Sequence, residues 1–139
     1  MRANFYEPGV QTEFFVWCDD DFEFNSKTNL DAFVNIIETS GYDVIGGGVG
    51  MNHLNAWRSY AKLNIEQGNF GEGFCVKRAK GGYGTLPGFK NCAVVDLIAN
   101  FYIARTSSAG QIRFDVQFTE IAHKEWFLDS IGRLRIAVW

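Results

Sequence analysis

TNLDAFVNIIET, residues 28–39, decides the fold, because its apolar side chains recur with the period of an α-helix. The apolar stripe consists of Leu30, Phe33, Val34 and Ile37. Thr28 stands three residues before Asp31, a spacing that suits a capping box at the first turn. Gly41 follows and accepts the left-handed backbone of a helix C-cap. The stretch therefore predicts a helix over residues 28–39 with one buried face.

Most other apolar residues alternate with polar ones, as they do in half-buried β-strands. The predicted strands are 13–18, 56–66, 74–79, 92–105, 111–121 and 133–139, and 42–45 is a further candidate for a short strand. The first is apolar on both faces, which is typical of a central strand. Helix and strand patterns compete over 53–66 and 92–105, where we prefer strands, and residues 123–130 are either a helical turn or irregular. The fold class is α+β: one principal helix packed against a curled, mostly antiparallel sheet of five to six strands.

At 139 residues the chain is predicted to form a single domain over 1–139. Five strands make a sheet roughly 24 Å wide, whereas a helix is only about 10–12 Å across. One helix cannot cover such a face. The sheet must curl around the helix, a second subunit must cover the remainder, or a pocket must remain, so we expect a homo-oligomer, most simply a homodimer.

Composition and charge limit the classes of partner. The net charge is −3, which disfavours nucleic-acid binding because phosphates call for a basic surface. No apolar run approaches the roughly 20 residues of a membrane span. Residues 1–4 are not followed by the apolar segment of a secretory signal, and three widely spaced cysteines suggest reduced thiols. These features predict a cytoplasmic protein with no nucleic-acid or membrane partner.

Most sequence motifs for cofactors are absent. The glycine-rich run at residues 46–50 has His53 or Met51 where the third glycine of a dinucleotide-binding fingerprint would stand, and no P-loop follows it. The two histidines, His53 and His123, lie far apart in the sequence, and no metal-binding spacing of cysteine and histidine occurs. The sequence predicts no cofactor and no metal centre.

Asp19, Asp20 and Asp21, with Glu23 close by, are the densest polar feature. Adjacent carboxylates repel one another, and confinement would raise the pKa of at least one, which suits acid–base catalysis. Carboxylates are also ligands for hard cations. The alternative is a solvated turn that ends the first strand.

Residues 14–21, followed by a helix that ends near Glu38, resemble the opening of the hot-dog thioesterases. The motif Phe24-Asn25-Ser26-Lys27 stands where that family commonly has His-Val-Asn-Asn. The resemblance implies a sheet wrapped around one long helix and hydrolysis of an acyl thioester. Asp21 or Glu38 would then be the base, with His53 in support.

The preferred functional hypothesis is a small soluble binding domain with an apolar, aromatic-lined pocket. The pocket is expected under a glycine-rich loop at residues 80–91, which would close over a small apolar or acyl-like ligand. Its predicted ligand-binding residues are Trp57, Arg58, Phe74, Tyr83, Phe89, Asp96, Phe101 and Phe114. The hot-dog-like hydrolase is one alternative, and an inhibitor or immunity-type protein-interaction module that uses its acidic turn is the other.

Overall fold

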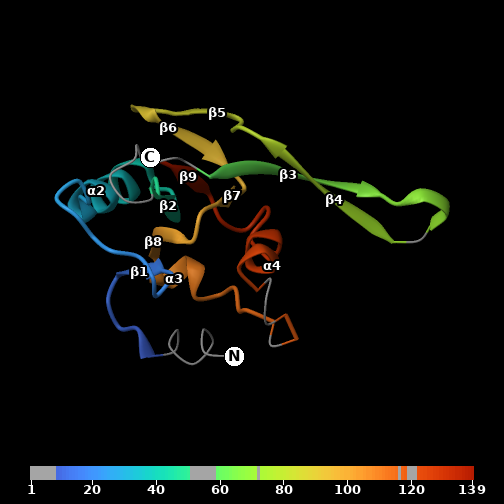
Figure 1. Ribbon diagram of the computed structural model, residues 1–139, viewed down its shortest axis with the longest axis horizontal. Coiled ribbons are helices and arrows are strands. Elements are labelled where there is room, and N and C mark those ends of the chain that lie inside the picture. Colours follow the sequence, from blue (N-terminus) through green and yellow to red (C-terminus); the bar gives the residue numbers. More distant parts are fainter. Residues whose placement is uncertain (1–8, 51–58, 72, 116, 119–121) are drawn as a thin grey trace.

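The computed structural model describes residues 9–50, 59–71, 73–115, 117–118 and 122–139. Its strands are β1 (Phe14–Cys18), β2 (Val44–Gly46), β3 (Tyr60–Gln67), β4 (Phe74–Lys80), β5 (Gly84–Leu86), β6 (Phe89–Val95), β7 (Leu97–Ile98), β8 (Phe101–Arg105) and β9 (Ile136–Val138). Its helices are α2 (Leu30–Ser40), the 3₁₀ turn η2 (Asn69–Gly71), α3 (Thr106–Ala109) and α4 (Ala122–Asp129). The strands form a six-stranded sheet, in the order β1-β8-β2-β9-β6-β5, and a three-stranded sheet, β4-β3-β7 (Figure 1).

The predicted helix is confirmed as α2, shifted by two residues at its start. Asn29 is the N-cap: its Oδ1 accepts a hydrogen bond from the Ala32 N–H at 3.0 Å. Thr28 instead bonds backward, since its Oγ1 accepts from the Asn25 N–H at 3.1 Å. Gly41 ends the helix with φ 69°, as predicted.

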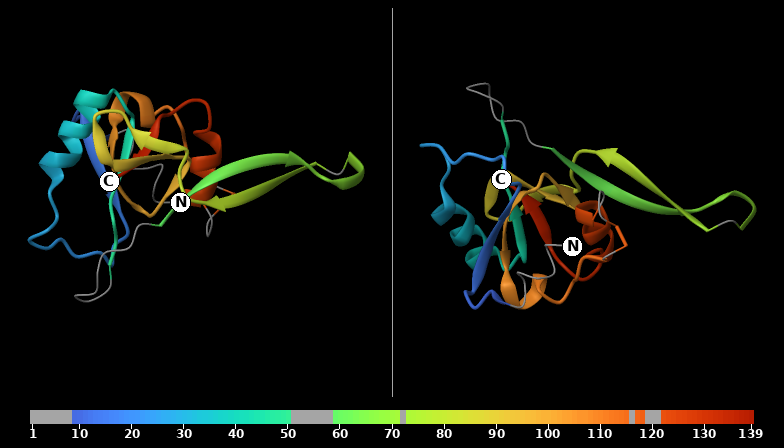
Figure 2. Two further views of the ribbon diagram at one scale, coloured as in Figure 1. Left: turned by 90° about the horizontal axis from the view of Figure 1, so that it is seen from above. Right: turned by 60° about the horizontal axis from the view of Figure 1, so that its bottom comes forward.

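The six-stranded sheet is covered on both faces, by α2 on one side and α4 on the other (Figure 2). Side chains of β8 alternate between the two layers: Phe101 and Ile103 pack with α2, whereas Tyr102 and Ala104 pack on the opposite face with Trp126 of α4. From the sequence, we expected the apolar surface left uncovered by the principal helix to require a curled sheet, a pocket or a second subunit. The second helix, α4, covers this surface instead.

The prediction of a mostly antiparallel sheet is right only in part, because the six-stranded sheet is mixed. β2 runs parallel to β9, with Val44 paired to Ile136, while its other neighbour β8 is antiparallel. β1 lies at the edge of this sheet rather than at its centre, and pairs only with β8 among the described strands. Its apolar side chains are covered only in part: Phe14, Phe15 and Trp17 pack against the two cores, whereas Val16 and Cys18 are exposed, as an edge position allows.

The prediction of a strand over 111–121 is wrong for its described residues, which form no strand. Ile112 and Phe114 do point inward, as the alternation suggested, and both are buried. A side chain, and not a neighbouring strand, bonds to the backbone here: the Ile112 carbonyl accepts a hydrogen bond from Trp126 Nε1 at 2.9 Å. Between the strands predicted at 92–105 and 111–121 lies the short helix α3, and most of the ambiguous segment 123–130 lies in α4.

The predicted loop at 80–91 is also wrong, because seven of its twelve residues lie in the end of β4, in β5 and in the start of β6. Gly81 and Gly88 adopt positive φ of 101° and 82° and make the tight turns that these short strands need. The segment 92–105 forms strands and not a helix, as predicted, but these residues are divided among β6, β7 and β8. Residues 53–58 of the other ambiguous segment lie outside the described residues, and the part from Tyr60 is β3.

The glycine-rich run at 46–50 begins inside the core. A Cβ on Gly47 would lie 2.6 Å from the ring of Phe101 and 2.8 Å from the ring of Phe33. The glycine is therefore explained by the close approach of α2 and β8, and not by the flexibility of a loop.

Candidate functional site

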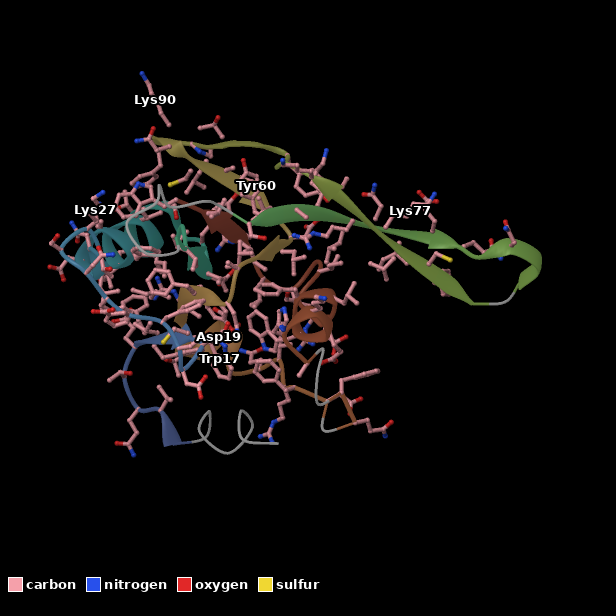
Figure 3. All side chains as sticks on the ribbon, viewed as in Figure 1. Trp17, Asp19, Lys27, Tyr60, Lys77 and Lys90 are labelled. Carbon is pink, nitrogen blue, oxygen red and sulfur yellow. The ribbon has the colours of Figure 1, made fainter. Side chains whose placement is uncertain are left out.

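The acidic residues Asp19–Asp21 follow β1 directly and are exposed. The register of β1 against β8 pairs Cys18 with Phe101, which places the turn before β8 beside the carboxylates. Asn100 lies in that turn, and its Nδ2 donates a hydrogen bond to Asp19 Oδ1. Figure 3 shows Asp19 and Trp17 close together at this end of β1.

Helix α4 brings a histidine to the same place. The pKa of His123 is lowered, mainly by burial and also by the neighbouring Lys124, while the carboxylate of Asp19 opposes the shift. A stack of aromatic rings holds α4 against β1: Trp17 stacks on Phe114 at 5.1 Å between centroids, and Phe114 on Trp126 at 6.1 Å. Asp19, Asn100 and His123 thus converge from three separate elements.

The side-chain oxygen of Asn100 is a second notable feature. Asn100 Oδ1 is buried and accepts no hydrogen bond from the described residues. A buried polar atom without a partner is uncommon, and an ion is one established reason for it. Within the described part of the chain, no three His, Cys, Asp or Glu side chains are grouped closely enough to hold a metal ion alone. A hard cation such as Mg²⁺ often needs only one or two protein carboxylates, because substrate phosphates and water complete its shell.

Glu125 lies on the same helix, two residues after His123. Burial is the main reason that its pKa is raised, and the nearby carboxyl of Asp129 adds to the effect. Its Oε2 accepts a hydrogen bond from the Asp115 N–H at 3.3 Å, which opposes the shift.

The predicted catalytic residues do not assemble in the described structure. Asp21 is exposed in the turn after β1, whereas Glu38 is exposed on the last turn of α2. His53 lies outside the described residues.

The predicted ligand-binding aromatics are also dispersed. Phe101 packs on the α2 face of the large sheet and Phe114 on the α4 face. Phe89 packs at the margin of the α2 layer, and Phe74 is 76% exposed on β4. The structure brings no pocket together from these four.

The two remaining described residues of that set form a junction. Asp96 Oδ2 accepts hydrogen bonds from the Tyr83 hydroxyl at 2.6 Å and from the Leu63 N–H at 2.7 Å. Trp57 and Arg58 lie outside the described residues. A hollow of about 170 Å³ is found elsewhere, and none of the predicted residues lines it; its lining is Asp43, Ser108, Gln111, Ile112, Arg133 and Leu134.

Comparison with known proteins identifies the relatives of the chain. No family model matches it. The chain is 38% identical over 127 residues to beta-1,4 N-acetylgalactosaminyltransferase 1 of Rattus norvegicus, a match that covers 91% of this chain and 24% of the rat protein. It resembles part of a glycosyltransferase. The proteins of that name from Homo sapiens and Mus musculus are 36% and 37% identical over the same length. The chain spans about a quarter of the length of these relatives.

These relatives overturn the functional predictions. The similarity is to N-acetylgalactosaminyltransferases, so the small-molecule binding domain, the hot-dog-like hydrolase and the inhibitor or immunity-type module are all wrong. The cytoplasmic assignment is wrong on the same finding: it rested on the absence of a signal segment and of a membrane span in a chain that covers about a quarter of the length of these relatives. None of the helices in the described residues is long and apolar enough to cross a membrane.

Sequence reasoning found Asp19–Asp21 and proposed a hard cation as one of their uses, but it missed Asn100 and His123 as neighbours. His123 lies in a segment with a weak helical pattern, and Asn100 is a single polar residue between two strands. The sequence prediction placed Asn100 inside one continuous strand over 92–105, so the turn before β8 that presents it to Asp19 was not foreseen. The register of β1 against β8 was also missing.

Proposed function

We propose that this chain is the part of a β-1,4 N-acetylgalactosaminyltransferase that holds the sugar donor. The identity of 33–38% over 91% of the chain to proteins of that activity carries the proposal. In such a transfer, an acceptor hydroxyl replaces a nucleoside diphosphate on the anomeric carbon of N-acetylgalactosamine. The donor is therefore a polyanion, and its binding site must compensate the charge of the diphosphate.

The end of β1 suits that task through a divalent cation. Asp19 and Asp21 would supply carboxylate oxygens to the ion, and Asn100 would orient Asp19 while offering its buried Oδ1. Burial lowers the pKa of His123, so the imidazole beside Asp19 adds little positive charge that would compete with a cation for the carboxylates. A cation held there would stabilise the negative charge that builds on the departing diphosphate.

Other residues of the chain would position this site. The Trp17–Phe114–Trp126 stack ties the strand that ends in the carboxylates to the helix that carries His123. The Asn100–Asp19 hydrogen bond joins the next strand to the same point. The ligands are therefore placed by the core and not by exposed loops alone, which is what a preorganised site requires.

Calorimetric titration of the chain with nucleoside diphosphates tests the proposal, with the uridine, guanosine and cytidine forms tried separately, with and without Mg²⁺ or Mn²⁺. We expect binding of at least one of them that requires the cation. Asp19→Asn and Asp21→Asn should each weaken it by about 10–100-fold, by analogy with the loss of groups that hold a metal. Transfer of N-acetylgalactosamine to a panel of sugar acceptors is then measured, with a donor that carries the nucleoside diphosphate that bound.

Asp31→Asn is the matched control, because Asp31 is an exposed carboxylate in the first turn of α2, away from this cluster. Circular dichroism checks that each variant is folded. Cation-independent binding, or an equal loss in Asp31→Asn, would rule out the carboxylate site. An absence of binding by every nucleoside diphosphate at millimolar concentration would contradict the proposed function itself.

A further inference from the structure

The hairpin of residues 60–80, β3 and β4 with the turn between them, projects from the body as an arm (Figures 1 and 2). Among the described strands, it is joined to the rest only at its root, where β3 pairs with β7 through Tyr60 and Ala61. Beyond that point β3 and β4 bond only to each other among the described strands. A two-stranded ribbon of this kind is marginally stable in water unless one face finds cover.

The two faces of the arm differ in character. Ile65 lies opposite Val76, and side chains two residues away share their face. The apolar face therefore carries Leu63, Ile65, Phe74 and Val76. Three of these are strongly exposed: Phe74 at 76%, Ile65 at 55% and Val76 at 47%. The other face is polar and includes an ion pair between Lys77 and Glu66.

The arm is basic on an acidic molecule. Residues 60–80 contain four basic and two acidic side chains, a net charge of +2, whereas the whole chain has −3 and its remainder therefore −5. On the apolar face the two kinds of side chain are segregated: Phe74 and Val76 lie toward the tip, and Arg78 and Lys80 lie toward the root. A partner that binds this face must therefore have an apolar interior, which receives Phe74 and Val76. It must also have negative charges nearer its surface, where Arg78 and Lys80 lie.

The area of the apolar face decides between a protein and a membrane as its binding partner. Strands of eight and seven residues give a face roughly 26 Å long and about 10 Å wide. This area of about 260 Å² is well below the roughly 800 Å² per partner of a stable protein interface. A membrane surface sets no such threshold, because the apolar side chains enter the acyl boundary while basic side chains meet anionic headgroups. Two arms would also repel each other by their charge.

We propose that the arm is a peripheral membrane contact, whose apolar face enters the interfacial region of an anionic lipid surface. Phe74, Val76 and Ile65 enter it, and Arg78 and Lys80 lie at the level of the headgroups. The acidic body does not prevent the contact, since the arm holds it farther away than the Debye length of about 8 Å in physiological salt. The sequence predicted no membrane partner from the lack of a spanning segment, and an arm that touches the surface needs none. This inference is independent of the proposed transferase activity.

Co-sedimentation of the chain with lipid vesicles tests it, in the presence of a reductant because Cys75 on β4 is exposed. We expect binding to phosphatidylcholine vesicles that contain roughly a third phosphatidylserine, and weaker binding to pure phosphatidylcholine or in high salt. Phe74→Ser and Lys80→Glu should each weaken the binding by about tenfold or more.

Each variant has a matched control on the body. Phe24→Ser removes an aromatic ring that is 52% exposed, and Lys27→Glu reverses an exposed charge near α2. Both should bind vesicles as the wild type does. The proposal is overturned if the wild type does not sediment with anionic vesicles, or if the controls lose as much binding as the arm variants. It is also overturned if the wild type forms a dimer that Phe74→Ser dissociates, because the occupant is then a second copy.

Discussion

Asp96 shows at the scale of one residue how a candidate ligand group turns out to have a structural use. Its Oδ2 accepts from the Leu63 N–H at the root of the arm and from the Tyr83 hydroxyl ahead of β5. Lys62 lies over the Tyr83 ring, 5.7 Å from its centroid. One carboxylate thus joins the three-stranded sheet to the six-stranded sheet and sets the direction in which the arm leaves the body.

The phenol of Tyr83 reports this junction. Its pKa is raised, first by the hydrogen bond to Asp96 and then by burial. The protonated phenol is favoured in the folded state, so its stabilising contribution is complete below the ordinary pKa of about 10 and is lost as the pH rises through the folded value. We expect Asp96→Asn, which keeps an acceptor for Leu63 but loses the charge, to bring the Tyr83 pKa back down. The phenolate absorbance of each protein, minus that of its Tyr83→Phe counterpart, measures it, and an unchanged midpoint would contradict the assignment.

At the scale of elements, α4 is the part of the fold that the sequence signalled least. Its packing depends on Trp126, which is 1% exposed, stacks with Tyr102 at 5.8 Å and donates its indole N–H to the Ile112 carbonyl. Neighbouring Phe127 meets it edge-on at 5.1 Å. The helix is therefore stabilised by tertiary contacts more than by its own sequence pattern.

Trp126→Ala should lower the free energy of unfolding by about 3–5 kcal/mol, because it leaves a large cavity between the sheet and α4. Trp126→Phe keeps much of the ring packing but leaves the Ile112 carbonyl without its donor, so a smaller loss of about 1–3 kcal/mol is expected. Urea denaturation followed by circular dichroism measures both. Equal stability of the Ala and Phe variants would show that the hydrogen bond and the stacking are not the terms that hold α4.

At the scale of the whole molecule, the body and the arm should differ in local stability. The core strands β2 and β8 are buried, with Val44, Ile45 and Ala104 fully inaccessible, whereas the distal arm from Asn64 to Gln67 is exposed throughout. Opening the distal arm uncovers little apolar surface and breaks few contacts.

We therefore expect the amides of the distal arm to exchange with deuterium far faster than those of β8, by at least about 100-fold. Hydrogen-exchange mass spectrometry at low micromolar concentration and without lipid measures the rates. Anionic vesicles should slow exchange in the arm and leave β8 unchanged. Similar rates in arm and body without lipid would mean that the arm already packs against something in solution.

Local patterns determined a good part of this molecule. The stripe and the closing glycine of residues 28–41 are sufficient for α2, because helix periodicity and capping act within a few residues. The alternation in residues 60–67 and 74–80 likewise anticipates the arm, since a hairpin needs only neighbouring partners. The acidic end of β1 was recognisable in the sequence as three consecutive aspartates, Asp19–Asp21.

Only the tertiary structure decided where those elements meet. The parallel pairing of β2 with β9 joins segments about 90 residues apart, and no local pattern specifies such a register. The alternation of 111–121 favoured a strand because Ile112 and Phe114 face the core. These two residues contact Trp126 of α4, however, and not a neighbouring strand. Asn100 reaches Asp19 across 81 residues, and His123 arrives on a helix held by aromatic stacking. Local sequence specifies which residues can form an element, whereas long-range packing determines which of them share a site.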